Sequence, residues 1–245
     1  GMVLALVIAL MILAGHAQSA FICITGLGLY ALLWPALSGR DPASVGRGRP
    51  WRDRLQDFPR RWAGGLIGLI VASIMAVLLT AVQLLPTMEL SQHSIRSAGL
   101  SFREATSFSL NPWRLPYTLL PPYGVDLSQV FGEAYGEYVA YVGVIGLGLA
   151  LLGAWQGWRR NASRRVVAAD LTPVSLKPPG RFFSLLAAVG LGLALGRINP
   201  VYYVLYTLVP GFASFRAPAR WMLLYAFGMA VLAGLGLEWL QRLGE

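Results

Sequence analysis

The sequence predicts an all-α integral membrane protein, a polytopic helix bundle of about six hydrophobic segments with one long outer loop. Hydrophobic residues make up 56% of the chain and charged residues 13%, against about 25% charged in soluble domains. The basic residues cluster between apolar runs, so the net charge of +9 is better explained by membrane topology than by nucleic-acid binding. One cysteine and two histidines exclude an internal disulfide framework and make a histidine-rich metal cage an unfavoured interpretation, and we predict no metal site.

Six hydrophobic segments follow one another along the chain, at about 2–14, 20–37, 62–85, 138–155, 182–196 and 221–240. A spanning helix needs about 20 apolar residues, so the first segment is too short to cross a bilayer by itself. We expect it to be the tail of a longer span. On this expectation residues 1–245 are an internal or C-terminal-side piece of one transmembrane domain.

Arginine distribution predicts the orientation of the segments. The connections 38–61 and 156–181, together with Arg242, carry fourteen of the twenty basic residues. Alternating spans place all three on one side, which the positive-inside rule makes cytoplasmic. The loop 86–137 then lies outside the cell, in a multi-pass protein of the cytoplasmic membrane.

Small residues predict which helix faces pack closely. Small residues recur at four-residue spacing in three segments: Gly64, Gly68, Ala72 and Ala76; Gly192 and Gly196; and Ala226, Ala230 and Gly234. Such ribbons let helix backbones approach in lipid, where van der Waals contact drives association. We expect each ribbon to face a neighbouring helix.

The outer loop 86–137 combines aromatic and acidic residues. It holds five of the eleven acids of the chain, and long loops of this kind are usually functional or disordered. Its segment Leu110–Pro122 is apolar, broken by prolines and too short to span, which predicts short interfacial or re-entrant helices with Trp113 and Tyr117 at the headgroup level. Such a surface suits an amphiphilic substrate, and it equally suits a lid without chemistry.

Arg216 and Arg220 stand four residues apart, just before the last hydrophobic segment. Arginine is costly at membrane depth, so the pair is either a set of interface anchors or a site for an anionic group. Arginine forks match phosphate and carboxylate geometry.

Other polar residues stand near the ends of the segments. Glu89, His93 and Arg96 share one helix face, and a Glu–His pair serves either acid–base chemistry or a structural hydrogen bond. His16 and Gln18 follow the first segment, and Gln83 ends the third.

Taken together, these pieces resemble the YfhO-type bacterial membrane proteins, within the GT-C-like class of glycosyltransferases that use a polyprenyl-phosphate sugar. The residues that carry the resemblance are Gly15–Gln18, Gln83–Pro86 followed by Glu89, Pro121–Gly124, Tyr138–Gly148, Leu195–Pro200, Val209–Phe212 and Phe215–Arg220. They occur in order over nearly the whole chain.

The resemblance implies an enzyme of the bacterial cytoplasmic membrane that moves a sugar from a polyprenyl-phosphate carrier to a cell-wall polymer or glycolipid. Its catalytic carboxylate is expected upstream of residue 1, so the catalytic residue is not assigned. Arg216 and Arg220 would bind the lipid phosphate and stabilise the leaving group. The lipid-linked sugar is the donor, and the membrane lipid and the envelope acceptor are the partners. No cofactor is assigned, and dependence on a divalent metal is left open.

Further side chains are assigned from the same resemblance. Glu89 and His93 are candidates for catalysis or acceptor positioning, and Tyr123 and Tyr135 for stacking on the sugar. The residues expected to line the substrate are His16, Gln18, Gln83, Tyr123 and Tyr135.

Two other functions compete with glycosyl transfer. A transporter or flippase for a lipid-linked or anionic solute would be expected to show internal symmetry, and no repeat is evident in the sequence. A non-catalytic membrane scaffold would use the outer loop as a docking surface.

Overall fold

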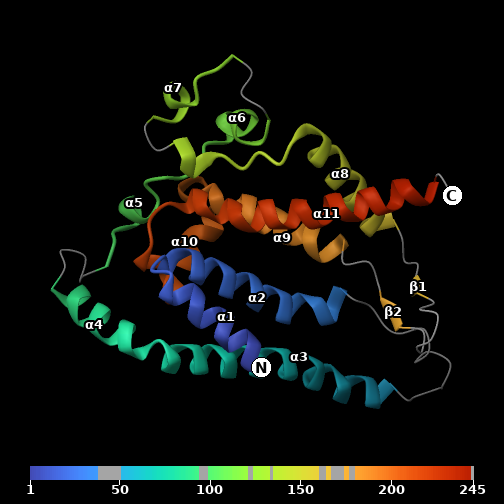
Figure 1. Cartoon of the computed structure of the whole chain (residues 1–245), viewed down its shortest axis with the longest axis horizontal. Helices are drawn as coiled ribbons and strands as arrows, with labels where there is room; N and C mark the ends of the chain where they lie inside the picture. The colour runs from blue at the N-terminus through green and yellow to red at the C-terminus, as the bar shows by residue number, and fades with distance from the viewer. Residues whose placement is uncertain are drawn as a thin grey trace.

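A computed structural model describes residues 1–37, 51–93, 99–120, 124–132, 135–159, 164–166, 174–176 and 180–243. These residues are almost entirely helical, so the predicted all-α class is confirmed apart from one small hairpin-like pair (Figure 1). That pair consists of β1 (Arg164–Val166) and β2 (Val174–Leu176), which run antiparallel.

Eight helices of nine or more residues form the bundle. They are α1 (Met2–Leu13), α2 (Ala17–Leu37), α3 (Trp51–Leu79), α4 (Ala81–Gln92), α8 (Val144–Arg159), α9 (Gly180–Ala194), α10 (Pro200–Leu208) and α11 (Met222–Leu243), all within the described residues. The shorter elements are α5 (Phe102–Ala105), η2 (Pro112–Arg114), α6 (Leu115–Leu119), α7 (Leu127–Phe131), η3 (Tyr135–Tyr138), η4 (Gly196–Ile198), η5 (Phe212–Ser214) and η6 (Pro218–Trp221), where η marks a 3-10 helix.

Three of the described helices are long and apolar enough to cross a membrane. The qualifying stretches are Ala17–Trp34, Trp62–Leu79 and Pro218–Leu243, and α1 and α9 are shorter apolar helices. Six spans are therefore not confirmed. The helix nearest to the predicted segment 138–155 is α8, which begins only at Val144 because Gly143 takes a left-handed φ of +83° ahead of it.

The predicted third segment, 62–85, differs from the structure at both ends. Helix α3 begins at Trp51, inside the predicted connection 38–61, where arginine, leucine and glutamine favour helix. It ends at Leu79, and α4 starts after a break at Thr80, where φ is −100° and ψ is 4°. The Thr80 hydroxyl donates to the Ala76 carbonyl oxygen at 2.8 Å, a back-bond that bends helices.

The predicted outer loop starts inside a helix, because α4 continues through Pro86 to Gln92. The described part of 86–137 beyond α4 is a series of short helices, several fixed by local caps. Ser101 and Glu104 form a capping box at α5, and Asp126 caps α7 through the Ser128 amide. Proline follows the Asn111 cap of η2, which favours a helix start at that point.

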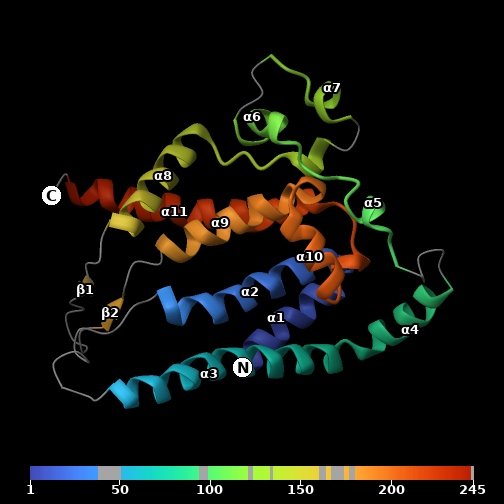
Figure 2. The same cartoon turned by 180° about the vertical axis from the view of Figure 1, so that it is seen from behind.

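The bundle has two groups of helices, which Figures 1 and 2 show one above the other. Helix α11 packs most extensively against α8 and α9, whereas α1, α2 and α3 form the second group. Helix α2 also contacts α9, and this contact joins the groups. Leu186, Trp221 and Leu232 are buried in the larger core, and Ile8 and Ala76 in the smaller one.

The closest helix contacts use other glycines than the sequence predicts. In α11 the packed positions are Gly228 and Gly236, whereas Gly234 has open space around it. The predicted ribbon on α11 is therefore wrong as a packing face. In α3 the prediction is half right: Ala72 and Ala76 are buried, and Gly64 and Gly68 have no close neighbour.

The connections sort to the two ends of the bundle. The C-terminal ends of α2, α8 and α11 and the N-terminal ends of α3 and α9 lie at one end, on the right of Figure 1. The turn between α1 and α2, helix α10 and the start of α11 lie at the other end. Arg216, Arg220, His16 and Gln18 all belong to this second end.

Candidate functional site

The candidate site is built where the turn before α2 meets η6 and η3. Ala217 precedes η6 and has φ 70° and ψ 71°, the only positive φ at a non-glycine residue of the described chain. Its carbonyl oxygen accepts a hydrogen bond from Gln18 Nε2 at 3.1 Å. Because Gln18 is buried, this bond holds the strained turn from which Pro218 starts η6 and directs Arg220 toward α2.

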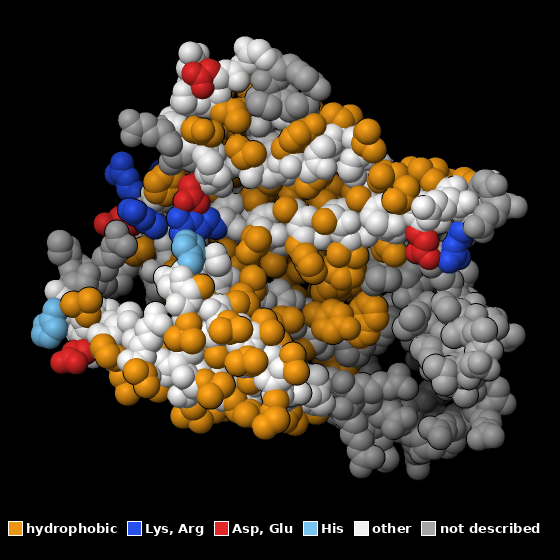
Figure 3. Space-filling view, in the orientation of Figure 1, with side chains coloured by type: hydrophobic (Ala, Val, Ile, Leu, Met, Phe, Trp, Pro, Cys, Tyr) orange, Lys and Arg blue, Asp and Glu red, His pale blue; other side chains and the backbone are white. Residues whose placement is uncertain are grey.

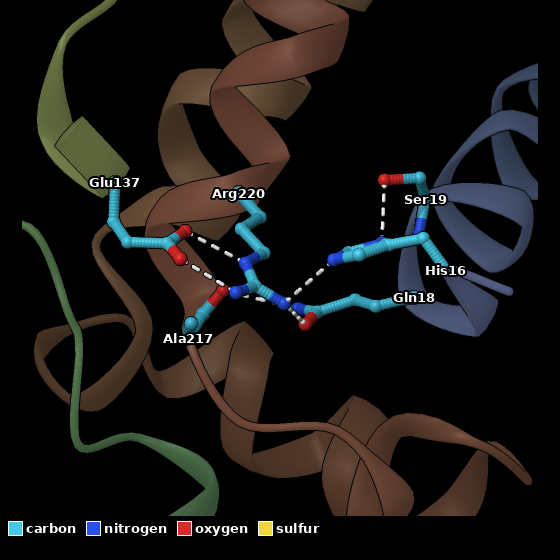
Figure 4. Close-up of polar contacts among 6 residues, drawn as sticks. All are labelled: His16, Gln18, Ser19, Glu137, Ala217 and Arg220. Atoms are coloured by element: carbon cyan, nitrogen blue, oxygen red, sulfur yellow. Dashed lines mark hydrogen bonds and ion pairs between the residues drawn. The ribbon is translucent and has the colours of Figure 1, made fainter.

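Arg220 and Glu137 form a two-pronged ion pair (Figure 4). Arg220 Nε donates to Glu137 Oε2 at 2.6 Å, and Nη2 donates to Oε1 at 2.5 Å. Paired charge-assisted bonds of this kind are among the strongest in proteins. The hydrogen bond from Arg220 holds the pKa of Glu137 below its ordinary value, against the opposing effect of partial burial.

The remaining side of the guanidinium faces the start of α2. Its Nη1 donates to Gln18 Oε1 at 2.8 Å and lies 3.2 Å from His16 Nε2. The other ring nitrogen, Nδ1, accepts a hydrogen bond from the Ser19 backbone N–H at 3.2 Å. Nδ1 also lies 2.8 Å from Ser19 Oγ, so the ring stands between Ser19 and Arg220.

An open pocket of about 660 Å³ lies beside this ion pair. Its polar wall consists of His16, Ser19, Glu137 and Arg220, and its apolar wall includes Val139, Ala140, Met222, Leu223 and Ala226. Ligand pockets commonly have volumes of roughly 300–1,000 Å³. Figure 3 shows most of the drawn charged side chains and both histidines on the left of the view, one acid–base pair on the right, and many hydrophobic side chains between them.

Arg216 has different surroundings from Arg220. Its side chain is exposed, and its guanidinium carbon lies 5.9 Å from the centre of the Phe108 ring. No hydrogen bond or ion pair joins Arg216 to another residue of the described chain. The two arginines therefore differ in charge balance: Arg220 is neutralised, and Arg216 keeps its charge available.

The other predicted site residues do not join this cluster. Gln83, Glu89 and His93 are exposed on α4, and within the described chain no hydrogen bond links Glu89 with His93. Tyr135 is exposed in η3 and is not among the residues that line the pocket. Tyr123, and Arg96 of the predicted Glu–His–Arg face, lie outside the described residues. The roles predicted for all of these residues stay predictions.

Sequence reasoning did not assign Glu137 to the site. It is one of five acids in the stretch 86–137, and nothing in its local sequence distinguishes it from the other four. The available signal was the cost of an unpaired arginine at the start of a hydrophobic helix, which calls for a nearby acid.

Neither protein-family models, curated proteins nor solved structures match this chain. The resemblance to YfhO-type proteins is therefore not tested and stays a prediction. Within the described residues, no group of three or more His, Cys, Asp or Glu side chains could hold a metal ion.

Proposed function

We propose that this chain is part of a membrane glycosyltransferase that moves a sugar from a polyprenyl-phosphate carrier to an outer-surface acceptor, a cell-wall polymer or glycolipid. The observation that supports this function is the pocket whose polar wall, with Glu137 and Arg220, meets the apolar wall of Met222 and Leu223. A lipid-linked sugar has the matching two parts, a polar head and an apolar tail.

The arrangement of the helix ends supports the proposed topology. The ends that flank the arginine-rich connections 38–61 and 156–181 lie together, opposite the end that carries the pocket. We propose that the former is the cytoplasmic side of a bacterial cytoplasmic membrane and that the pocket and residues 86–137 are on the outer side. Trp113 and Tyr117 are 87% and 38% exposed, as expected of residues at the headgroup level.

The two arginines take separate roles in this proposal. Arg216 is the cation that binds the carrier phosphate, because no carboxylate of the described chain forms an ion pair with it. Charge at that position would stabilise the phosphate as it leaves the sugar. Arg220 is a positioning residue, since its donors are used by Glu137 and Gln18.

Native mass spectrometry in nanodiscs with a polyprenyl-phosphate sugar tests this function on the full-length protein. Arg216→Ala is expected to weaken donor binding about tenfold or more, the usual weight of a charge-assisted contact. Arg216→Lys should recover only part of it, because lysine lacks the planar fork. Arg242→Ala is the matched control, because it removes an arginine paired with Glu238 on the last turns of α11.

Transfer of labelled sugar to envelope acceptors is the second readout. Donor binding together with transfer supports the glycosyltransferase. Binding and sugar movement across a vesicle membrane without transfer would favour the transporter. Absence of donor binding in the wild type would contradict both and favour the scaffold.

A further inference from the structure

The ion pair in the polar wall of the pocket carries no net charge. The Arg220 guanidinium and the Glu137 carboxylate offset each other through two hydrogen bonds. A phosphate entering the pocket would therefore meet a guanidinium that is already paired with a carboxylate.

The remaining hydrogen-bonding capacity of this wall consists mainly of acceptors. Three of the five N–H groups of Arg220 donate to Glu137 and Gln18, and Nη1 also lies 3.2 Å from His16 Nε2. Each Glu137 oxygen accepts one bond from Arg220 and keeps a free lone pair, and the Ser19 hydroxyl can also accept. These groups favour a ligand that donates hydrogen bonds.

The charge of the ligand follows from the same atoms. A phosphate or carboxylate brings only acceptors and would be repelled by Glu137, whereas an ammonium group would be repelled by Arg220. Hydroxyl groups donate without a charge. The neighbouring Met222, Leu223 and Ala226 supply an apolar wall on the helix whose sequence is suited to span a membrane.

We infer that this pocket binds the uncharged, hydroxyl-rich head of a glycolipid and discriminates against anionic heads. Resting on the proposed function, this inference assigns the pocket to the sugar and leaves the phosphate to Arg216 outside it. Glu137 is then the residue that sets specificity, since it both neutralises Arg220 and offers lone pairs to sugar hydroxyls.

Two probes with the same short tail test the inference, hexyl glucoside and hexyl phosphate. Their affinities for the full-length protein are measured in nanodiscs by ligand-observed NMR. The wild type should bind the glucoside at least about tenfold more tightly than the phosphate, the usual weight of one hydrogen bond to a charged group. Equal affinities, a preference for the phosphate or no binding of either probe would overturn the inference.

Glu137→Gln gives the sharpest contrast. It keeps the side-chain size but leaves the Arg220 charge unpaired, so the preference should reverse in favour of the phosphate. Glu137→Gln combined with Arg220→Gln should lose this anion preference again. An unchanged ratio of affinities in Glu137→Gln contradicts the assigned role of the carboxylate.

Two further variants separate this role from a loss of structure. Ala226→Leu fills the apolar wall without touching the ion pair, so both probes should bind less well. Arg242→Gln changes net charge on the final turns of α11 and should leave the ratio unchanged. Glucoside preference without sugar transfer would reject the proposed function and keep the pocket assignment. Sugar transfer without glucoside preference would keep the proposed function and reject the pocket assignment.

Discussion

Replacing Gly190 by alanine should push α9 away from the start of α11. A Cβ atom at this position would lie 2.7 Å from the Tyr225 backbone nitrogen and 2.8 Å from the Trp221 carbonyl oxygen. Both are shorter than the 3.0 Å below which real Cβ contacts essentially never occur. Both are backbone atoms, so no side chain can rotate to make room and the helices must separate.

Gly192→Ala is the matched control on the same helix, because its Cβ would meet only Asn199 Nδ2 at 3.9 Å. Both variants gain the same helix propensity, so the difference between their free energies of unfolding isolates the packing cost at Gly190. Overpacking costs about 1–3 kcal/mol, and clashes with two backbone atoms place Gly190→Ala near the upper end. At about 2–4 °C per kcal/mol, the melting temperatures should differ by roughly 6–12 °C.

Thermal unfolding followed by tryptophan fluorescence in nanodiscs measures this difference. Trp221, one of the eight tryptophans of the chain, is buried at the affected contact and contributes to this signal. Melting temperatures within 2 °C of each other, where about 6 °C or more is expected, would refute the packing argument and the placement of α9 against α11.

Three other outcomes follow from the structure. Pairing with Arg220 lowers the pKa of Glu137 from its ordinary 4.5. The stability that the ionised carboxylate adds to the folded state is therefore complete above that pH, and it is lost as the pH falls through the lowered pKa. Acidification from about pH 5 to pH 3 should therefore narrow the gap in melting temperature between wild type and Glu137→Gln; a constant gap contradicts this. Ala217→Gly should stay within about 1 kcal/mol of wild type because it relieves a positive φ, while Ala187→Gly inside α9 should lose at least about 1 kcal/mol in denaturant unfolding; equal losses contradict the strain. Arg242→Ala, which breaks the exposed pair with Glu238, should change stability by less than about 0.5 kcal/mol, and a larger loss in the same unfolding assay contradicts a surface role.

The helices could be predicted from the sequence where hydrophobicity alone decides. The segments around Ala17–Trp34, Trp62–Leu79 and Pro218–Leu243 are long apolar runs, and each is helical. The break at Thr80 was not foreseen, because the apolar run continues through it. The N-terminal part of α3 is not predicted, because its charged residues favour a connection between membrane spans. The same residues also favour helix, and the structure places them in α3.

The candidate site could be predicted only in part. His16, Gln18 and Arg220 were proposed separately, and they meet in the structure. Glu137 could not be chosen because its pairing with Arg220 spans 83 residues. The left-handed Ala217 was equally hidden, since alanine carries no sequence signal for a positive φ.

Glycine spacing shows the same limit within one helix. In α11 the ribbon through Gly234 and the one through Gly228 and Gly236 run on different faces, and each has small residues suited to close packing. The positions of α8 and α9 determine which face is used, and the sequence of α11 alone does not show where these helices pack.

The polar cluster also sets an order of events during synthesis. His16 and Arg220 are 204 residues apart, so at 5–20 residues per second about 10–40 s separate their emergence from the ribosome. During that interval Gln18 has no arginine to bond, and Glu137 has none over the last 83 residues of it. Arrival of η6 supplies both bonds at once. Closure of this end of the bundle therefore waits for η6, and a chain that stops short of Arg220 leaves Glu137 without its arginine.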